Sequence, residues 1–260
     1  MEFPYYIWIG PLKVHPHIFF ETLAYSLGFQ LWRIRQKKLA HTEGDSLIDS
    51  NQKMWLLAAV ILGAALGAKL LAWIETPWDP ATGQWILPGK TIAGGLLGGW
   101  AAIEFTKYKL KIKQRTGDNY VMPLCIGIAL GRIGCFLTGL DDHTYGMATN
   151  LPWAVNFGDG ILRHPTQLYE SGFLMLLAIG IYLLQKMIPH LQNGSYFQIF
   201  MAAYCLFRVG IETLKPSLKF YAGLSAIQAA CVAGCGIALW NLFDLNKKRL
   251  ESTPISEQGI

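Results

Sequence analysis

Residues 127–139 read Gly-Ile-Ala-Leu-Gly-Arg-Ile-Gly-Cys-Phe-Leu-Thr-Gly, an apolar run that carries a single charge, Arg132. A charged side chain is costly in the hydrocarbon core of a membrane unless an anionic or acidic group meets it, so an arginine there indicates a functional site. Glycine lets backbones and a ligand come close, and four glycines surround this arginine: Gly127, Gly131, Gly134 and Gly139. The run therefore predicts a tightly packed transmembrane helix around whatever Arg132 holds.

The whole chain has the composition of a membrane protein, with 260 residues of which 52% are hydrophobic and 15% charged. We predict an all-α integral membrane protein with seven transmembrane helices, at about 16–32, 55–74, 88–105, 121–138, 166–187, 196–214 and 221–243. No soluble domain can be separated from these segments, so residues 1–260 are predicted to form a single polytopic membrane domain. An outer-side loop segment at about 140–163 is expected to be either a short amphipathic lid over the site or a plain connecting loop.

The orientation follows from the loops. Fourteen lysines and arginines fall in the loops and tail on one side of the predicted spans, and five on the other. The positive-inside rule places the N-terminus outside and the C-terminus in the cytoplasm. Because the positive charge lies in short loops between helices, it indicates membrane topology and not nucleic-acid binding.

Three bases and three acids within the predicted spans lie in the half nearer the outer face, whereas Glu104 lies at the inner end of the third span. The bases are Lys69, Arg132 and Arg208, and the acids are Glu21, Glu170 and Glu212. They are either structural ion pairs that hold the helices together or the lining of a site. Two arginines suit a phospholipid headgroup, because the planar guanidinium grips phosphate oxygens and stays charged when dehydrated, and Lys69 would add a point charge.

One face of the first span carries His17, Glu21 and Tyr25 at spacings of four residues. This stripe either carries a proton away from a nucleophile or consists of an interfacial histidine and tyrosine beside one ion-paired glutamate. The five cysteines fall in apolar runs without the spacing and the histidine or carboxylate neighbours of a zinc site, so we interpret most of them as packing residues. No spacing in the chain implies a metal or an organic cofactor.

Several motifs carry a resemblance that covers nearly the whole chain in order. They are the glycine-rich run from Gly131 to Gly139 followed by Gly146, the block Arg163-His164-Pro165-Thr166-Gln167-Leu168-Tyr169-Glu170, and Phe207-Arg208 with Glu212. Weaker similarities include Tyr25 with Gly28-Phe29, and Gly94-Gly95-Leu96-Leu97-Gly98. With these motifs the chain resembles the bacterial prolipoprotein diacylglyceryl transferases.

The resemblance implies a multi-pass enzyme of the bacterial inner membrane. Its members move the diacylglyceryl group of phosphatidylglycerol to the lipobox cysteine of a prolipoprotein signal peptide and release glycerol phosphate. By resemblance, Arg132 and Arg208 would hold the phosphate and steady it as it leaves. The expected substrate-binding surface comprises Lys69, Tyr25, Gly131, Gly134, Gly139, Gly146, His164, Gln167, Tyr169, Glu170, which is expected to pair with an arginine, and Glu212.

The sequence departs from the family pattern where a proton must be handled. The family's histidine before Gly-Gly-Leu-Leu-Gly is Ala93, an early tyrosine of the first span aligns with Glu21, and two asparagines of the glycine-rich signature are Cys135 and Thr138. Glu21 or His143 is the candidate replacement base, and Cys135 is either a nucleophile or a small apolar filler. Two alternatives stay open: the same phospholipid donor with a different acceptor, and a non-catalytic lipid-binding membrane protein.

Overall fold

The computed structural model describes residues 3–42, 48–76, 89–188, 191, 193–217, 219 and 223–252. These residues form seven α-helices: α1 (Pro16–Thr42), α2 (Ser50–Glu75), α3 (Ile92–Lys109), α4 (Val121–Thr138), α5 (Thr166–Met187), α6 (Ser195–Glu212) and α7 (Ala226–Ser252). Each predicted span coincides with one helix, so the all-α class is confirmed. Helix α1 continues about ten residues beyond its apolar part, because the lysines, arginine and glutamine that follow are good helix formers.

Four helical segments are long and apolar enough to cross a membrane, judged over the described part of the chain. They are Ser50–Glu75, Gly117–Asp142, Thr166–Met187 and Ala226–Lys247. The second contains α4 together with the 3-10 turns η1 (Gly117–Tyr120) and η2 (Gly139–Asp142) at its two ends. These helices make the chain a membrane protein.

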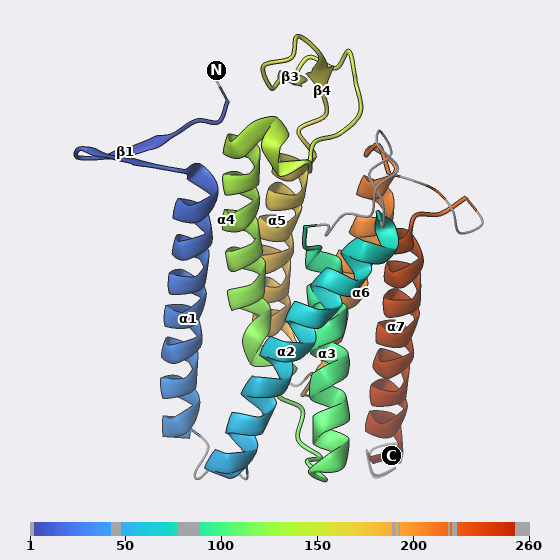
Figure 1. Cartoon of the computed structure of the whole chain (residues 1–260). Coiled ribbons are helices and arrows are strands. Elements are labelled where there is room, and N and C mark those ends of the chain that lie inside the picture. The colour runs from blue at the N-terminus through green and yellow to red at the C-terminus, as the bar shows by residue number, and fades with distance from the viewer. Residues whose placement is uncertain are drawn as a thin grey trace.

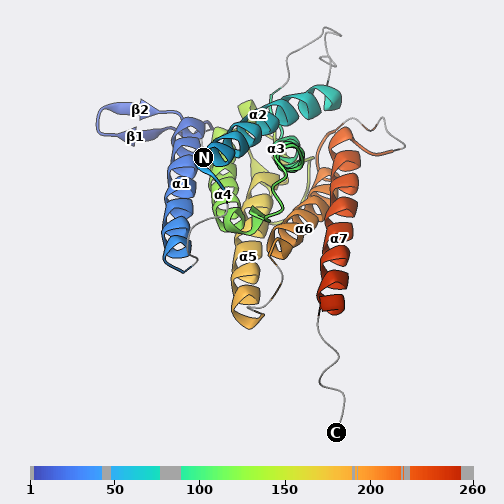
Figure 2. The ribbon, with the colours of Figure 1, turned by 90° about the horizontal axis from the view of Figure 1, so that it is seen from below.

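The helices pack mainly in neighbouring pairs. Helix α4 lies between α1 and α5, α2 crosses α3, and α6 packs along α7 (Figures 1 and 2). Two short hairpins, β1 (Ile7–Ile9) with β2 (Leu12–Val14) and β3 (Val155–Asn156) with β4 (Leu162–Arg163), lie near the end of the bundle where α1 begins and α4 ends (Figure 1). The segment at 140–163 therefore folds as a turn and a small hairpin and contains no α-helix. Helix α7 ends at the opposite end of the bundle.

A buried apolar cluster joins α3, α4, α5, α6 and α7. Its largest fully buried members are Leu174, Ile181, Phe200, Met201 and Tyr204. Ala93, which the resemblance aligns with a histidine, belongs to this cluster and is 1% exposed. The position is thus part of the apolar packing, and a replacement base must come from another element.

Glycines bring α2 and α3 into backbone contact. A Cβ placed on Gly98 would collide with the Gly63 carbonyl oxygen and lie 2.8 Å from the Gly67 Cα. A Cβ on Gly94 would meet the Gly67 carbonyl oxygen in the same way. The glycine-rich third span is therefore a tightly packed helix, because only glycine permits this approach.

Substituting Gly98 by alanine is expected to destabilise the protein. The added methyl group would press on backbone atoms of α2, which cannot rotate away, and overpacking of this kind costs about 1–3 kcal/mol. Thermal unfolding of the purified protein in detergent measures the loss. Gly236→Ala in α7 is the matched control, because a Cβ there meets no atom within 4 Å. Equal unfolding temperatures for both variants would contradict the close α2–α3 approach.

Candidate functional site

Glu170 on α5 is the centre of a buried ion-pair network. Its Oε2 lies 2.8 Å from Arg132 Nε on α4 and 3.2 Å from Arg208 Nη1 on α6. Its Oε1 accepts a hydrogen bond of 2.7 Å from the Tyr204 hydroxyl. One carboxylate thus holds two arginines from different helices together.

A second glutamate completes this network. Glu212 Oε2 lies 3.0 Å from Arg208 Nη2, one helical turn further along α6. All four charged side chains are buried, with no more than 6% of any side chain exposed. Two arginines and two glutamates balance in charge, which is the condition under which a buried ionic cluster is tolerated.

Buried polar atoms without a hydrogen-bond partner among the described residues occur on the helices that carry the network: on Arg208 itself, and on Gln167, which precedes Glu170 by three residues on α5. Within the described residues, Gln167 Oε1 and Nε2 and Arg208 Nε are buried without a hydrogen-bond partner. Buried polar groups are normally satisfied, and an exception indicates a ligand or water. Two of the three atoms are donors, and one of them belongs to the charged guanidinium of Arg208, so the arrangement suits an anion with several acceptor oxygens, such as a phosphate.

Lys215 adds a charge that the sequence prediction missed. It follows the end of α6, is half-buried, and interacts electrostatically with Arg208, Arg132, Glu170 and Glu212. Burial disfavours its charged form, and the two arginines repel it, so the pKa of Lys215 falls from 10.5 to about 7. In the sequence, Lys215 follows Glu212 by three residues, and this spacing could have placed both at the same helix end. Its position in a predicted loop instead indicates an exposed residue that contributes only to membrane orientation.

The sequence block that ends at Glu170 forms a wall at the start of α5. The Tyr169 hydroxyl accepts a hydrogen bond of 2.7 Å from Trp153 Nε1 and lies 3.3 Å from His164 Nδ1. The Gly146 backbone N–H donates to the His164 carbonyl, and a Cβ on Gly146 would lie 2.6 Å from the His164 Cβ. Gly146, His164 and Tyr169 are therefore fixed relative to one another.

The glycines of residues 127–139 have different structural roles. A Cβ on Gly134 would lie 2.7 Å from the Phe20 Cβ, so this glycine allows α1 to approach α4. Gly139 has a φ of 78°, which favours glycine, and packs against Phe3. A Cβ on Gly131 would meet no atom within 4 Å, so close packing does not explain this glycine.

Glu21 takes part in a separate polar group on α1. It pairs with Lys90 at 2.7 Å, accepts a hydrogen bond of 3.1 Å from the Tyr25 hydroxyl, and lies 3.6 Å from His17 Nε2. In the expected stripe on α1, Tyr25 is thus hydrogen-bonded to Glu21 and His17 lies at ion-pair distance from it. Lys69, on α2, and His143, which ends η2, are both exposed, and the ion pairs around Glu170 involve neither.

The interpretation that the cysteines lack histidine and carboxylate neighbours is wrong for Cys135. Its Sγ, a ring nitrogen of His17 and a carboxylate oxygen of Asp142 all lie within 4.8 Å of one another. His17 lies on α1, more than a hundred residues away in sequence, so no local spacing could have shown this cluster. Cys135 Sγ also lies 3.9 Å from Arg132 Nη1, which joins the cluster to the ion-pair network.

Comparison with known proteins gives a consistent result. The sequence profile of the family described as "Prolipoprotein diacylglyceryl transferase" matches residues 4–243. A relative from Desulfotalea psychrophila is 29% identical over 271 aligned residues, covering 93% of each chain. One from Bordetella parapertussis is 28% identical, covering 89% of this chain and 92% of the relative, and one from a Wolbachia of Brugia malayi is 32% identical over 66% of each chain. All three relatives are named phosphatidylglycerol–prolipoprotein diacylglyceryl transferase.

Proposed function

The chain belongs to the prolipoprotein diacylglyceryl transferase family, and from this premise we propose that it transfers the diacylglyceryl group of phosphatidylglycerol to the lipobox cysteine of a prolipoprotein. The observation that carries the proposal is the buried network of Arg132, Arg208, Glu170 and Glu212, with unsatisfied donors beside it. The family match over residues 4–243 covers every residue of this network.

The proposed reaction needs a leaving phosphate to be stabilised. The acceptor sulfur attacks the glycerol carbon that bears the phosphate, an S–C bond forms, and the C–O bond breaks. The electron pair of that bond leaves on glycerol phosphate. Arg132 and Arg208 are positioned by Glu170 before the substrate binds, so they meet the growing phosphate charge without rearranging.

The wall beside the network is proposed to hold the rest of the donor headgroup. Gln167 offers one donor and one acceptor without a partner in the described structure, which suits the glycerol hydroxyls of phosphatidylglycerol. His164, Tyr169 and Gly146 hold the loop beside it, and the open space over Gly131 leaves room for substrate. Lys69 and Tyr25 remain proposed lipid contacts.

We infer that all seven helices cross the bacterial inner membrane as one domain, residues 1–260, with the N-terminus outside and the C-terminus in the cytoplasm. The support is the excess of lysine and arginine in alternate loops. In this orientation the β3–β4 hairpin and Glu170 lie towards the outer face, where a secreted prolipoprotein presents its signal peptide.

Glu21 is the proposed base for the acceptor thiol, in preference to His143. Glu21 is joined to Cys135 and Arg132 through His17, whereas the side chain of His143 is exposed and makes no hydrogen bond or ion pair within the described residues. Glu21→Gln is expected to lower transfer by about 10²-fold, within the range for general-base catalysis. His143→Ala is the matched control and is expected to keep full activity. Full activity in Glu21→Gln would remove Glu21 from this role.

The function is tested by a transfer assay with the purified protein in detergent. Phosphatidylglycerol labelled in its diacylglycerol part is mixed with a lipobox peptide, and label on the peptide is measured, with Arg132→Ala as the blank. Label that appears with the wild type and is absent from the blank supports the proposal. Phosphatidylglycerol binding without transfer to any thiol peptide would overturn it, and would favour a lipid-binding protein, for which Ala93 in place of the family histidine is the specific observation.

Lys215 predicts a pH dependence for phospholipid binding. The lysine is protonated below its folded pKa of about 7, so the positive charge that faces the phosphate is present below pH 7 and is lost as the pH rises. Affinity for phosphatidylglycerol is expected to fall about threefold to tenfold between pH 6 and pH 9. Lys215→Arg should flatten this dependence, because arginine stays protonated.

The lowered pKa of Lys215 also makes the stability of the folded protein depend on pH. The unfolded chain keeps this proton up to about pH 10.5 and the folded chain up to about pH 7, so stability without lipid rises with pH between these values. Binding that is equally tight at pH 6 and pH 9 in the wild type would contradict the placement of Lys215 near the phosphate. Thermal unfolding at both pH values separates the two effects.

A further inference from the structure

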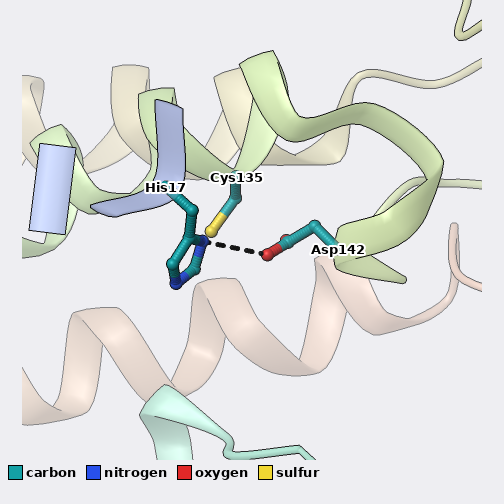
Figure 3. Close-up of side chains that lie close together, drawn as sticks. All are labelled: His17, Cys135 and Asp142. Atoms are coloured by element: carbon teal, nitrogen blue, oxygen red, sulfur yellow. Dashed lines mark ion pairs between the residues drawn. The ribbon is translucent and has the colours of Figure 1, made fainter. Parts of the chain in front are cut away.

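Three potential metal ligands from separate elements meet beside the ion-pair network (Figure 3). His17 lies on α1, Cys135 on α4 and Asp142 on η2, and their ligand atoms all lie within 4.8 Å of one another. His17 Nδ1 and Asp142 Oδ1 are 3.3 Å apart. A tetrahedral zinc ion places a nitrogen and an oxygen ligand about 3.3 Å apart, given bonds of about 2.0–2.1 Å.

The surroundings hold these ligands in the orientation that a metal needs. His17 Nε2 lies 3.6 Å from Glu21 Oε2, and Glu21 is held by Lys90 and Tyr25. The other oxygen of Asp142 accepts a hydrogen bond from the Thr144 hydroxyl. Histidine ligands of metals commonly have a carboxylate facing their second ring nitrogen, and Glu21 lies on that side of His17.

The 3.3 Å contact between His17 Nδ1 and Asp142 Oδ1 needs either a proton on Nδ1 or a cation between the two atoms. A neutral imidazole carries one N–H, and if Nε2–H faces Glu21, the lone pair of Nδ1 faces the Asp142 carboxylate. Two acceptors then lie 3.3 Å apart with nothing between them. A cation between Nδ1, Oδ1 and Sγ removes this conflict. The competing solutions are neutral His17 with its proton on Nδ1, and His17 protonated on both nitrogens.

We propose that His17, Cys135 and Asp142 bind a zinc ion with an open fourth position. Sulfur, imidazole and carboxylate ligands together are typical of zinc, and three protein ligands are typical of catalytic rather than structural sites. The site reaches the surface, because 32% of the His17 side chain is exposed. The carboxylate of Asp142 and a Cys135 thiolate balance the charge of the ion.

The fourth ligand is the thiolate of the acceptor cysteine, a step that rests on the proposed function. Thiols have an ordinary pKa of about 8.5 and glutamates of about 4.3, so Glu21 alone is a poor base for a free thiol. A thiol that coordinates a metal is deprotonated on binding, and its proton passes to Glu21, the base proposed above. The sulfur then lies close to Arg132, which is 3.9 Å from Cys135 Sγ, and forms the S–C bond as the phosphate leaves.

The zinc site is tested by metal content and by cobalt substitution. The protein is purified through a tag without histidine, equilibrated with Zn²⁺ and washed, and zinc per chain is measured by mass spectrometry. About one zinc per chain is expected in the wild type and at least about tenfold less in Cys135→Ser. Co²⁺ in the same site is expected to give a sulfur-to-metal charge-transfer band in the near ultraviolet that Cys135→Ser lacks.

Cys235→Ser is the matched control, because Cys235 is a half-buried cysteine of α7 outside the cluster. This variant should keep both the zinc and the cobalt band, and thermal unfolding checks that Cys135→Ser is folded. A wild type without zinc, or equal zinc in wild type and folded Cys135→Ser, would overturn the site and leave His17 as a protonated partner of the two carboxylates.

A second arm tests the fourth position. A lipobox peptide added to the cobalt protein is expected to increase the charge-transfer band, and the same peptide with serine in place of cysteine is not. No increase with the cysteine peptide would overturn thiolate binding. The outcomes also separate the two proposals. If zinc-free Cys135→Ser still transfers the diacylglyceryl group, zinc has no role in the reaction and the proposed function stands. If the wild type binds zinc but does not transfer the group, the proposed function is wrong and the zinc site stands.

Discussion

Arg208→Ala is expected to lower transfer from phosphatidylglycerol by at least about 10²–10³-fold, the effect of removing one charge-stabilising donor from a reaction site. Arg208 contacts both Glu170 and Glu212 and keeps its Nε without a partner among the described residues. Its loss removes a fixed positive charge that the leaving phosphate is proposed to meet. The initial rate of labelled peptide formation at saturating lipid measures the loss.

Two further variants separate catalysis from folding. Arg208→Lys keeps a positive charge but cannot form the planar two-point contact of a guanidinium, so we expect it to remain at least about tenfold slower than wild type. Arg33→Ala, on the exposed surface of α1, is the matched control and should transfer normally. If Arg208→Ala and Arg208→Lys both transfer at the wild-type rate, the arginine has no part in the reaction.

Glu170→Ala is expected to produce the largest loss of stability. Its carboxylate is 1% exposed and is shared by Arg132 and Arg208, so its removal leaves two buried guanidinium groups facing each other. Breaking a buried ion pair by removing one partner costs about 3–5 kcal/mol. Thermal unfolding in detergent measures this loss, and transfer is expected to disappear with it because both arginines lose their positions.

Graded variants test that explanation. Tyr204→Phe removes a single hydrogen bond to Glu170 and is expected to cost about 1 kcal/mol. Asp159→Ala breaks the ion pair with Arg163 in the surface hairpin, where solvent screens the charges, so no measurable change is expected. An unfolding temperature of Glu170→Ala equal to that of Asp159→Ala would show that the buried network contributes nothing to stability.

The helices themselves could be predicted because their signals are local. Seven apolar runs separated by charged or turn-forming segments overlap α1 to α7. The arginine in residues 127–139 and the block ending at Glu170 also indicated the site, because charge within an apolar run is informative without any knowledge of the fold.

The partners of these charges could not be predicted in the same way. Six charged residues were expected at a similar depth in the membrane. Depth alone does not determine which helices are neighbours, so it does not determine which charges form pairs. In the structure Glu170 meets both arginines, whereas Glu21 turns to Lys90 and His17, and Lys69 is exposed. Lys215 interacts electrostatically with all four members of the network, although its position in a predicted loop indicated a residue away from the site.

By itself, the sequence determined the family, the helical segments and the buried arginines, since each depends on residues close together in the chain. The tertiary structure alone decided that Cys135 lies beside His17 and Asp142, and that Ala93 is packed in apolar surroundings. The physical reason is that the packing of α1 on α4, set by Gly134 against Phe20, brings together side chains that no spacing in the sequence relates.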